Sequence, residues 1–248
     1  MKIIGDIGNT EVKICLVDKN FNIKKKIIVK SNNITLFIIK KNLNKFLKYK
    51  KHINYVVFSS VVPQIYKQFS HFFKSNLNIS ITEIKNLNLN KIIDIKVNKK
   101  QVGSDRLANS IAAIDNKFNY IIIDFGTATT FDVIVKNKYL GGIISPGINL
   151  SLRTLTSKAS LIPTINLKKI SNVIGKNTNE AVRSGFFWGY AGLIDNMIKL
   201  IKKKTRIRFK VILTGGLADL YKNSINTKCK VDRDLTIKGI IKVAKNLI

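Results

Sequence analysis

The chain repeats one short sequence pattern about halfway along its length. The segment Ile3–Thr10 (IIGDIGNT) returns as Ile122–Thr129 (IIDFGTAT), so that Asp124 follows Asp6 by 118 residues in a chain of 248. In both copies an apolar run leads into an acid, a glycine and hydroxyl side chains. Alternating residues follow, which predicts a β-hairpin around a tight turn. Two copies of such a unit at this spacing predict an α/β protein with two similar lobes, residues 1–116 and 117–248.

The rest of the chain has the periodicity of alternating strands and helices. Apolar residues two apart predict strands, and apolar residues three and four apart predict helices. The expected strands are Lys2–Ile7, Val12–Val17, Ile23–Val29, Tyr55–Ser59, Ile79–Thr82, Tyr120–Asp124, Thr129–Val135, Tyr139–Ile144, Lys210–Leu213 and Lys228–Val231. The expected helices are Asn33–Tyr49, Pro63–Phe73, Leu107–Ile114 with Ser104 or Asp105 near its N-cap, Ile148–Ser157, Asn179–Lys203, a start at Gly216–Tyr221, and Asp234–Asn246.

The positive charge of the chain has two interpretations. Lys and Arg number 44 against 14 acids, giving a net charge of +30, but only six of the 44 are Arg. A nucleic-acid binder would be expected to show Arg, aromatic residues among the basic ones, and a recognisable module. Here the basic runs Lys24–Lys26, Lys48–Lys51 and Lys202–Lys204 are short and separated, and Lys, Asn and Ile share AT-rich codons. We therefore expect lysines on solvated faces and no specific nucleic-acid partner.

No sequence feature points to export or to a membrane. Asp6 interrupts the N-terminal apolar run, and the apolar stretch Phe186–Ile198 contains Asp195 and is too short to span a bilayer. Two cysteines, Cys15 and Cys229, could form one disulfide at most. We expect a cytoplasmic protein with no membrane partner.

The first motif, Asp6–Lys13, has the composition of a phosphate-binding turn. A glycine in a hairpin lets backbone N–H groups approach phosphate closely, Asn9 and Thr10 add donors, and Lys13 adds a cation. Asp6 could hold a hydrated Mg²⁺. The alternative is an ordinary hairpin with Asp6 as a turn former. The repeat of the same pattern around Asp124 favours the functional interpretation.

Two more motifs carry acids beside groups that bind anions. In Asp124–Thr130, Asp124 could ligate a cation or orient a phosphate-bound water, although a Thr-rich strand is the alternative. In Gly103–Arg106, Asp105 could accept a hydroxyl proton and Arg106 could pair with a carboxylate. The alternative there is a helix N-cap followed by a surface Arg.

Three glycine motifs complete the pattern. The strand ending in Thr214–Gly216 offers a surface without side chains that a nucleotide could approach. Gly141–Gly147 reads as a strand exit rich in turns. Gly175–Thr178 leads into a helix with Gly185, Gly189 and Gly192, whose small size would allow close packing within the chain or across a dimer.

In this order the six motifs resemble those of type III pantothenate kinase, within the actin and sugar-kinase superfamily. The resemblance runs from Met1 to about Gly239. It implies two lobes of the ribonuclease H-like type with an ATP cleft between them. The implied activity is the ATP-dependent phosphorylation of the 4′-hydroxyl of pantothenate, the first step of coenzyme A synthesis.

The resemblance also implies roles for individual residues, with ATP, Mg²⁺ and a monovalent cation as cofactors. The ATP-binding residues are Asp6, Ile7, Gly8, Asn9, Thr10, Glu11, Val12, Lys13 and Thr127. Asp124 corresponds to the metal ligand for K⁺ or NH₄⁺. The pantothenate-binding residues are Gly103, Ser104, Asp105, Arg106 and Thr178, and Asp105 is the catalytic proton acceptor. The family is a homodimer, and its pantothenate site lies near the subunit interface.

The chain departs from the family pattern at two places. Lys96–Lys99 stands where the family usually shows an aromatic residue and a Pro before the Gly-x-Asp-Arg motif, which bears on substrate affinity and not on the reaction. Arg233 stands where Pro is common. Two other functions stay open: another small-molecule kinase or acyl-phosphate-forming enzyme, and a non-catalytic relative that acts as a regulatory accessory factor. The presence of Asp6, Asp105 and Asp124 among only 14 acids favours the kinase.

Overall fold

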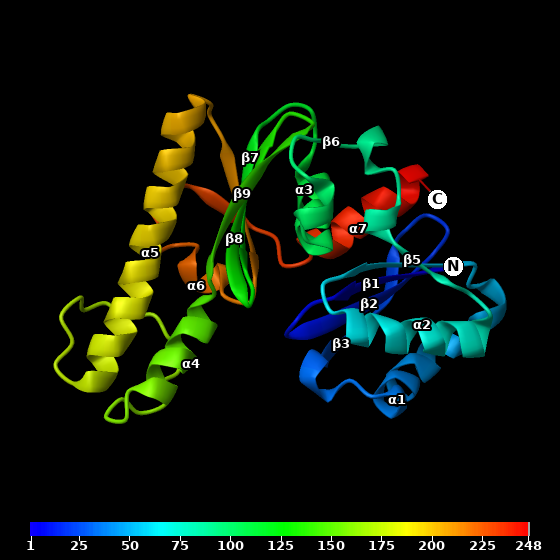
Figure 1. Cartoon of the computed structure of the whole chain (residues 1–248), viewed down its shortest axis with the longest axis horizontal. Coiled ribbons are helices and arrows are strands. Elements are labelled where there is room, and N and C mark those ends of the chain that lie inside the picture. Colours follow the sequence, from blue (N-terminus) through cyan, green and yellow to red (C-terminus); the bar gives the residue numbers. More distant parts are fainter. Residues whose placement is uncertain (248) are drawn as a thin grey trace. The chain divides into compact units, whose positions relative to one another are not determined.

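The computed structural model describes residues 1–247 and divides into two compact units (Figure 1). Unit 1 comprises Met1–Ile114, Asn137–Tyr139 and Asp234–Ile248, and unit 2 comprises Asp115–Lys136 and Leu140–Arg233. Both units are α/β, and each contains an antiparallel hairpin joined to parallel strands. The expected α/β fold with a repeated hairpin is therefore confirmed.

Unit 1 is built on a five-stranded sheet in the order β3-β2-β1-β4-β5. Its strands are β1 (Lys2–Ile7), β2 (Glu11–Val17), β3 (Ile23–Lys30), β4 (Tyr55–Ser60) and β5 (Ile81–Glu83). β1, β2 and β3 are antiparallel neighbours, whereas β4 and β5 run parallel to β1. The carboxyl ends of β1, β4 and β5 consequently meet at one edge of the sheet, which is where α/β sheets bind ligands.

Helices cover both faces of this sheet (Figure 1). α1 (Leu36–Leu47) and α2 (Pro63–Leu77) share one apolar core with alternate residues of the strands, in which Phe58 packs on Phe69 and Phe73. α3 (Ser104–Ala113) and α7 (Leu235–Leu247) contact β1 and β4. Because side chains alternate along a strand, buried Ile4 and Val57 face these two helices.

Short 3₁₀ turns and one small strand connect these elements. The turns are Ser31–Asn33, Lys50–His52, Ile84–Asn86, Leu89–Lys91 and Lys99–Gln101. β6 (Asp94–Ile95) pairs in parallel with Lys138 and Tyr139 at the start of β9.

The C-terminal helix belongs to unit 1, although the sequence division at residue 116 assigned it to the second lobe. The physical reason is its close packing on α3. A Cβ atom added to Gly239 of α7 would lie 1.9 Å from the carbonyl oxygen of Ala108, so the glycine lets the two helix backbones touch. The functional division into the two predicted lobes stays a prediction.

Unit 2 carries most of a six-stranded sheet in the order β11-β10-β7-β8-β9-β6. Its strands are β7 (Tyr120–Phe125), β8 (Ala128–Val135), β9 (Lys138–Pro146), β10 (Lys210–Gly215) and β11 (Cys229–Val231). Its helices are α4 (Ile148–Lys158), α5 (Thr178–Thr205) and α6 (Ala218–Tyr221). One face of the sheet packs on α5 and α6, where the ring of Tyr221 stacks on Phe125 and Phe187.

Among residues 1–247, no helix has the length and apolar character needed to cross a bilayer. Cys15 and Cys229 are both free thiols.

Candidate active site

The β1–β2 hairpin holds the first predicted motif at the carboxyl edge of unit 1. Gly8 N–H donates to the carbonyl oxygen of Glu11 (3.0 Å) and closes the turn. Asn9 and Thr10 are exposed in the turn, whereas Ile7 and Val12 are buried in the core. The hairpin therefore presents backbone and polar groups to solvent and is anchored by the two apolar side chains.

Ser31, directly after β3, fixes the shape of this hairpin. Its Oγ donates to the carbonyl oxygen of Gly8 (2.6 Å), and its backbone N–H donates to the carbonyl oxygen of Thr10 (2.9 Å). Ser31 is only 8% exposed. Sequence reasoning missed this residue because a serine in Lys-Ser-Asn-Asn carries no signal of a contact made more than twenty residues back.

Asp6 and Lys13 lie on one face of the sheet at the same level. The β1–β2 register pairs Asp6 with Lys13, and the β1–β4 register pairs Asp6 with Ser59. Alternation places these three side chains on the face that packs on α3 and α7, at its carboxyl edge. Asp6 and Lys13 are half-buried, so an acid and a cation stand next to each other beside the turn.

The third motif, Gly103–Arg106, forms the start of α3. Asp105 Oδ1 accepts a hydrogen bond from the backbone N–H of Arg106 (2.8 Å). A Cβ atom on Gly103 would lie 2.5 Å from that same Oδ1, so the glycine leaves room for the carboxyl group to fold back on its own helix. Burial raises the pKa of Asp105, and the N–H and the charge of Arg106 oppose that shift.

Our prediction of the N-cap residue of this helix was wrong. We expected Ser104 or Asp105 at that position, but the N-cap is Gly103 and makes no side-chain cap. Ser104 instead turns inward, and its Oγ donates to Oε1 of Glu83. Asp105 is thereby left to present its carboxyl group from the first turn of the helix.

Val61 links the start of α3 to the β1–β2 hairpin. Its N–H donates to the carbonyl oxygen of Ile7 (3.0 Å), and its Cγ1 lies 3.7 Å from the Cβ position of Gly103. Unit 1 alone therefore brings together two of the predicted motifs, Asp6–Lys13 and Gly103–Arg106.

Unit 2 assembles a second group around Asp124, at the end of β7. Asp124 is paired in register with Thr130 of β8 and with Thr214 of β10. Gly215 has a φ of 85°, and a Cβ atom there would lie 2.5 Å from Asp124 Oδ1. Only glycine adopts this backbone freely and lets the turn approach the carboxyl group so closely.

Thr127 lies in the turn between β7 and β8. Its carbonyl oxygen accepts a hydrogen bond from Gly147 N–H (3.1 Å), which ties the strand exit Gly141–Gly147 to the turn. Thr129 points into the unit 2 core and is fully buried. Three predicted motifs, Asp124–Thr130, Gly141–Gly147 and Thr214–Gly216, thus come together within unit 2.

Thr178 is exposed at the first position of α5. The N-cap before it is Asn177, whose Oδ1 accepts from Glu180 N–H (3.0 Å). Thr178 lies outside the three motifs that meet around Asp124.

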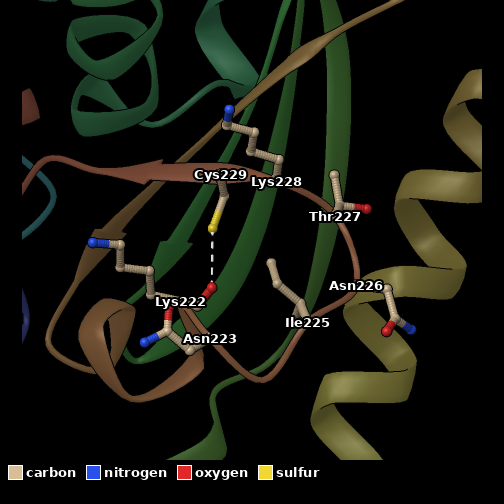
Figure 2. Close-up of a pocket in the computed structure, with 7 residues that line it drawn as sticks. All are labelled: Lys222, Asn223, Ile225, Asn226, Thr227, Lys228 and Cys229. Atoms are coloured by element: carbon tan, nitrogen blue, oxygen red, sulfur yellow. Dashed lines mark hydrogen bonds between the residues drawn. The ribbon is translucent and has the colours of Figure 1, made fainter.

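A surface hollow of about 460 Å³ in unit 2 contains none of the predicted site residues (Figure 2). It is lined by Lys222, Asn223, Ile225, Asn226, Thr227, Lys228 and Cys229. The Cys229 thiol donates to the carbonyl oxygen of Lys222 (3.5 Å), and burial raises the pKa of that thiol. A protonated thiol is a weak nucleophile, so the hollow offers no evident chemistry.

The carboxylate oxygens of the predicted site suit hard cations, but they do not enclose an ion by themselves. Among residues 1–247, no group of three or more His, Cys, Asp or Glu side chains could enclose a metal ion. Asp6 and Asp124 each supply a carboxylate near a glycine turn. Mg²⁺ is commonly held by one or two carboxylates together with substrate phosphates and water, so the oxygen donors fit.

Solved structures share this fold over nearly the whole chain. A ROK family glucokinase from Streptomyces griseus, in complex with glucose and AMPPNP, aligns with a TM-score of 0.56 and 11% identity over 99% of this chain and 98% of that one. The activator of the 2-hydroxyisocaproyl-CoA dehydratase from Clostridium difficile, with bound ADPNP, aligns with a TM-score of 0.55 and 14% identity over 98% and 92%. At such identities the likeness defines the fold class alone, that of the sugar kinases and actin-like ATPases.

Sequence comparison then identifies the family. The model of type III pantothenate kinase matches residues 2–200. The type III pantothenate kinase of Pelagibacter ubique (strain HTCC1062) is 57% identical over 242 residues, covering 98% of both chains. That of Sulfurihydrogenibium sp. (strain YO3AOP1) is 35% identical over 257 residues, covering 97% of this chain and 98% of its own. The chain belongs to the type III pantothenate kinase family, as its motifs indicated.

Ser31 provides a test of the hairpin that does not alter any predicted site residue. Ser31→Ala removes the donor to Gly8 and leaves a carbonyl oxygen short of a partner, at a cost of about 1–2 kcal/mol. We expect the KM for ATP to rise roughly 5- to 20-fold, since 1.4 kcal/mol corresponds to a factor of ten. Steady-state kinetics with varied ATP measure this.

The matched control is Ser157→Ala, which removes a similar bond to the carbonyl oxygen of Thr154 on the exposed side of α4. The KM for ATP should stay unchanged in this variant. A KM within twofold of the wild type in a folded Ser31→Ala protein would mean that the hairpin keeps its shape without the serine.

Proposed function

We propose that Asp105 is the proton acceptor in the transfer of the γ-phosphoryl group of ATP to the 4′-hydroxyl of pantothenate. The reaction itself follows from the family: the chain is a pantothenate kinase, and its product enters coenzyme A biosynthesis. The match to type III pantothenate kinases over 98% of the chain carries this conclusion and does not favour the regulatory alternative.

The arrangement in unit 1 supports the roles of the two motifs. Phosphoryl transfer depends mainly on positioning and on neutralising charge. In our proposal backbone N–H groups of the exposed turn between β1 and β2, together with the Lys13 ammonium, bind the phosphates of ATP. Asp105 then accepts the hydroxyl proton, and Gly103–Arg106 hold pantothenate, with Arg106 paired to its carboxylate.

Two cations complete the proposal. Asp6 would hold Mg²⁺, which when bound neutralises charge on the phosphates. Asp124 would hold K⁺ or NH₄⁺, and Thr127 beside it would contact ATP. The close approach of the Gly215 backbone to Asp124 supports a compact site there, because nothing bulky separates the carboxyl group from the turn.

The role of Asp105 is tested by substitution with asparagine. Asp105→Asn keeps an oxygen that can accept from Arg106 N–H, so the helix start is preserved, but it removes the ability to accept a proton. We expect kcat to fall by at least about 10²-fold with the melting temperature little changed. Near-normal turnover of the folded variant would contradict the assignment.

The same carboxyl group also predicts the pH dependence. Burial raises the pKa of Asp105, and below that pKa the protonated group cannot act as a base. Activity should therefore fall, as the pH is lowered, at a higher pH than an ordinary aspartate would give. The acid limb of kcat/KM against pH measures this, and the limb should vanish in Asp105→Asn.

The role of Asp124 is tested by exchanging salts. If its carboxylate holds a monovalent cation, ion size sets the fit, and activity should be high in potassium chloride and poor in sodium chloride. Asp124→Ala should lose most activity and the remaining dependence on potassium. Equal rates in both salts, at matched ionic strength, would contradict a cation site at Asp124.

We also propose that the protein is a homodimer that pairs through α5. Gly185, Gly189 and Gly192 lie on the exposed side of this helix with open space around their Cβ positions. Two large apolar side chains on the connection between α4 and α5, Leu161 (91%) and Ile174 (85%), are also exposed. Pairing would cover them, and it would give Thr178, exposed at the start of α5, a place at a site near the interface.

The dimer is tested at Gly189. Gly189→Arg fits the open space of a single chain but would prevent close packing of two helices. We expect light scattering after gel filtration to change from about twice 28.0 kDa to the monomer mass, with unchanged circular dichroism. Asn44→Arg on the exposed side of α1 is the control and should stay dimeric. A dimeric Gly189→Arg protein would place the interface elsewhere.

Two expectations remain predictions. A cytoplasmic location suits two cysteines that are both free. A surface of dispersed lysines suits the absence of a specific nucleic-acid partner, since such a surface binds polyanions without sequence preference and in a salt-dependent way.

A further inference from the structure

Glu83 is a half-buried carboxylate beside the proposed site that the mechanism above does not use. It is the last residue of β5. Oε1 accepts a hydrogen bond from Ser104 Oγ, and Oε2 accepts one from Lys85 N–H (2.8 Å). A carboxylate taken out of water is costly unless its oxygens are bonded, so these contacts explain how the group is retained.

The end of β5 brings Glu83 next to the start of α3. β5 pairs with β4 so that Glu83 is level with Phe58, and Phe58 is level with Gly5 of β1. Glu83 therefore lies at the same carboxyl edge of the sheet as the β1–β2 hairpin. Ser104, which it binds, is the first residue of α3 and is only 2% exposed.

The first turn of α3 is supported from within by Asp105 Oδ1, which accepts from Arg106 N–H. The N-cap residue, Gly103, has no side chain to accept the first N–H groups. A negative charge near a helix N-terminus is favourable because of the helix dipole. The contact of Glu83 with Ser104 Oγ adds support for this turn from β5, although it satisfies a side-chain hydroxyl and not a backbone N–H group.

We propose that Glu83 is a positioning residue that holds Ser104 and so aims the carboxyl group of Asp105 at the substrate hydroxyl. This inference rests on the proposed function of Asp105. Asp105 follows Ser104 directly, and its Oδ1 is bonded to the next N–H of the same turn. A shift of this turn would move the base, and a misplacement of about 1 Å can cost on the order of 10²-fold in rate.

Charged and titratable groups face Glu83 from each element around it. Lys85 follows it in the chain, Lys99 lies on the turn that precedes α3, and Tyr66 lies on α2. The backbone of Ser60 on β4 also donates to it. Burial raises the pKa of Glu83, while its bonds and the charge of Lys85 oppose the shift.

The two lysines also tie down the segment that leads into α3. Lys85 Nζ donates to the carbonyl oxygen of Lys100 (2.9 Å), and Lys99 Nζ donates to that of Leu87 (2.8 Å). Lys85 lowers the pKa of Asp105 as well as that of Glu83. The start of α3 is therefore held on one side by Glu83 and on the other by a segment fixed through lysine.

The test compares Glu83→Ala with Glu83→Gln. Glutamine keeps an oxygen for Ser104 Oγ but has no charge, whereas alanine has neither. We expect Glu83→Ala to lower kcat about 10- to 10²-fold with the KM for ATP within about twofold, and Glu83→Gln to stay within about threefold of the wild type. Glu83→Ala added to Ser104→Ala should cause little further loss in kcat, because each variant alone already removes the bond between Glu83 and Ser104 Oγ.

A second readout does not depend on activity. Loosening the turn should expose the Asp105 carboxyl group to water, which lowers its pKa, since burial is what raises it. We expect the carbon-13 carboxyl titration of Asp105 to move to lower pH in Glu83→Ala and much less in Glu83→Gln. Equal shifts in both variants would overturn positioning, because charge alone would then account for the effect.

Asp18→Asn is the matched control for general stability. Asp18 accepts backbone N–H bonds from Asn20 and Asn22 (2.9 Å each) in the turn at the opposite end of β2. It should leave kcat and the Asp105 titration unchanged. If Glu83→Ala fails to fold, Ser104→Ala and Glu83→Gln carry the test, because Ser104→Ala should then show the loss in kcat and the shift of Asp105.

The outcomes separate this inference from the proposed function. A wild-type protein that does not phosphorylate pantothenate would overturn the proposed function, while the titration of Asp105 would still report on positioning. An active wild type with an unchanged kcat and Asp105 titration in Glu83→Ala would overturn the role of Glu83 alone.

Discussion

Parallel pairing next to an antiparallel hairpin is the constraint on which both units depend. In unit 1 the register sets Asp6 level with Ser59, and in unit 2 it sets Asp124 level with Thr214. Because parallel strands end at the same edge, the loops that follow them converge without any contact designed for that purpose. Each acid then stands beside a glycine turn, where backbone N–H groups and a carboxylate can serve one ligand.

Close approach of backbones turns this shared edge into a specific arrangement. A hydrogen atom in place of a side chain at Gly239 lets α7 lie against α3, and α3 carries Asp105. At Gly215 the missing side chain likewise lets the backbone after β10 approach the carboxyl group of Asp124. An added methyl group would lie 1.9 Å from the carbonyl oxygen of Ala108 at Gly239 and 2.5 Å from Asp124 Oδ1 at Gly215, far inside van der Waals contact. A packed interior cannot absorb such a shift cheaply.

The sequence was informative where function depends on local pattern. The repeat predicted both hairpins. The spacing of apolar residues predicted the strands and helices to within a few residues of their ends, because alternation and helical spacing are properties of neighbouring residues. Asp6–Lys13, Asp124–Thr130 and Gly103–Arg106 are each contiguous, so their composition could be interpreted without knowledge of the fold. Their chemistry, as distinct from the family, stays a prediction.

The sequence was uninformative where function depends on topology. Ser31 meets Gly8 because β3 returns along β2, and Glu83 meets Ser104 because β5 ends next to the start of α3. The C-terminal helix joins unit 1 because Gly239 permits contact with Ala108, more than a hundred residues earlier. The N-cap of α3 was misassigned for a related reason, since the partner that draws Ser104 inward lies on another element.

The distribution of acids explains why a few of them matter so much. From Lys19 to Thr82 the chain has thirteen Lys and no acid, so Glu83 ends a long basic stretch. Acids elsewhere are mostly engaged: Asp18 and Asp115 each accept backbone N–H bonds, and Asp195 accepts from Asn226.

A basic surplus on solvated faces costs little, because water and salt screen exposed charges. A half-buried carboxylate such as Glu83 cannot be replaced so freely, since both of its oxygens accept hydrogen bonds. Drift toward lysine would therefore change the surface and leave acids such as Glu83 and Asp105 in place. The net charge of the chain thus carries little information about function, whereas the positions of its remaining acids carry much of it.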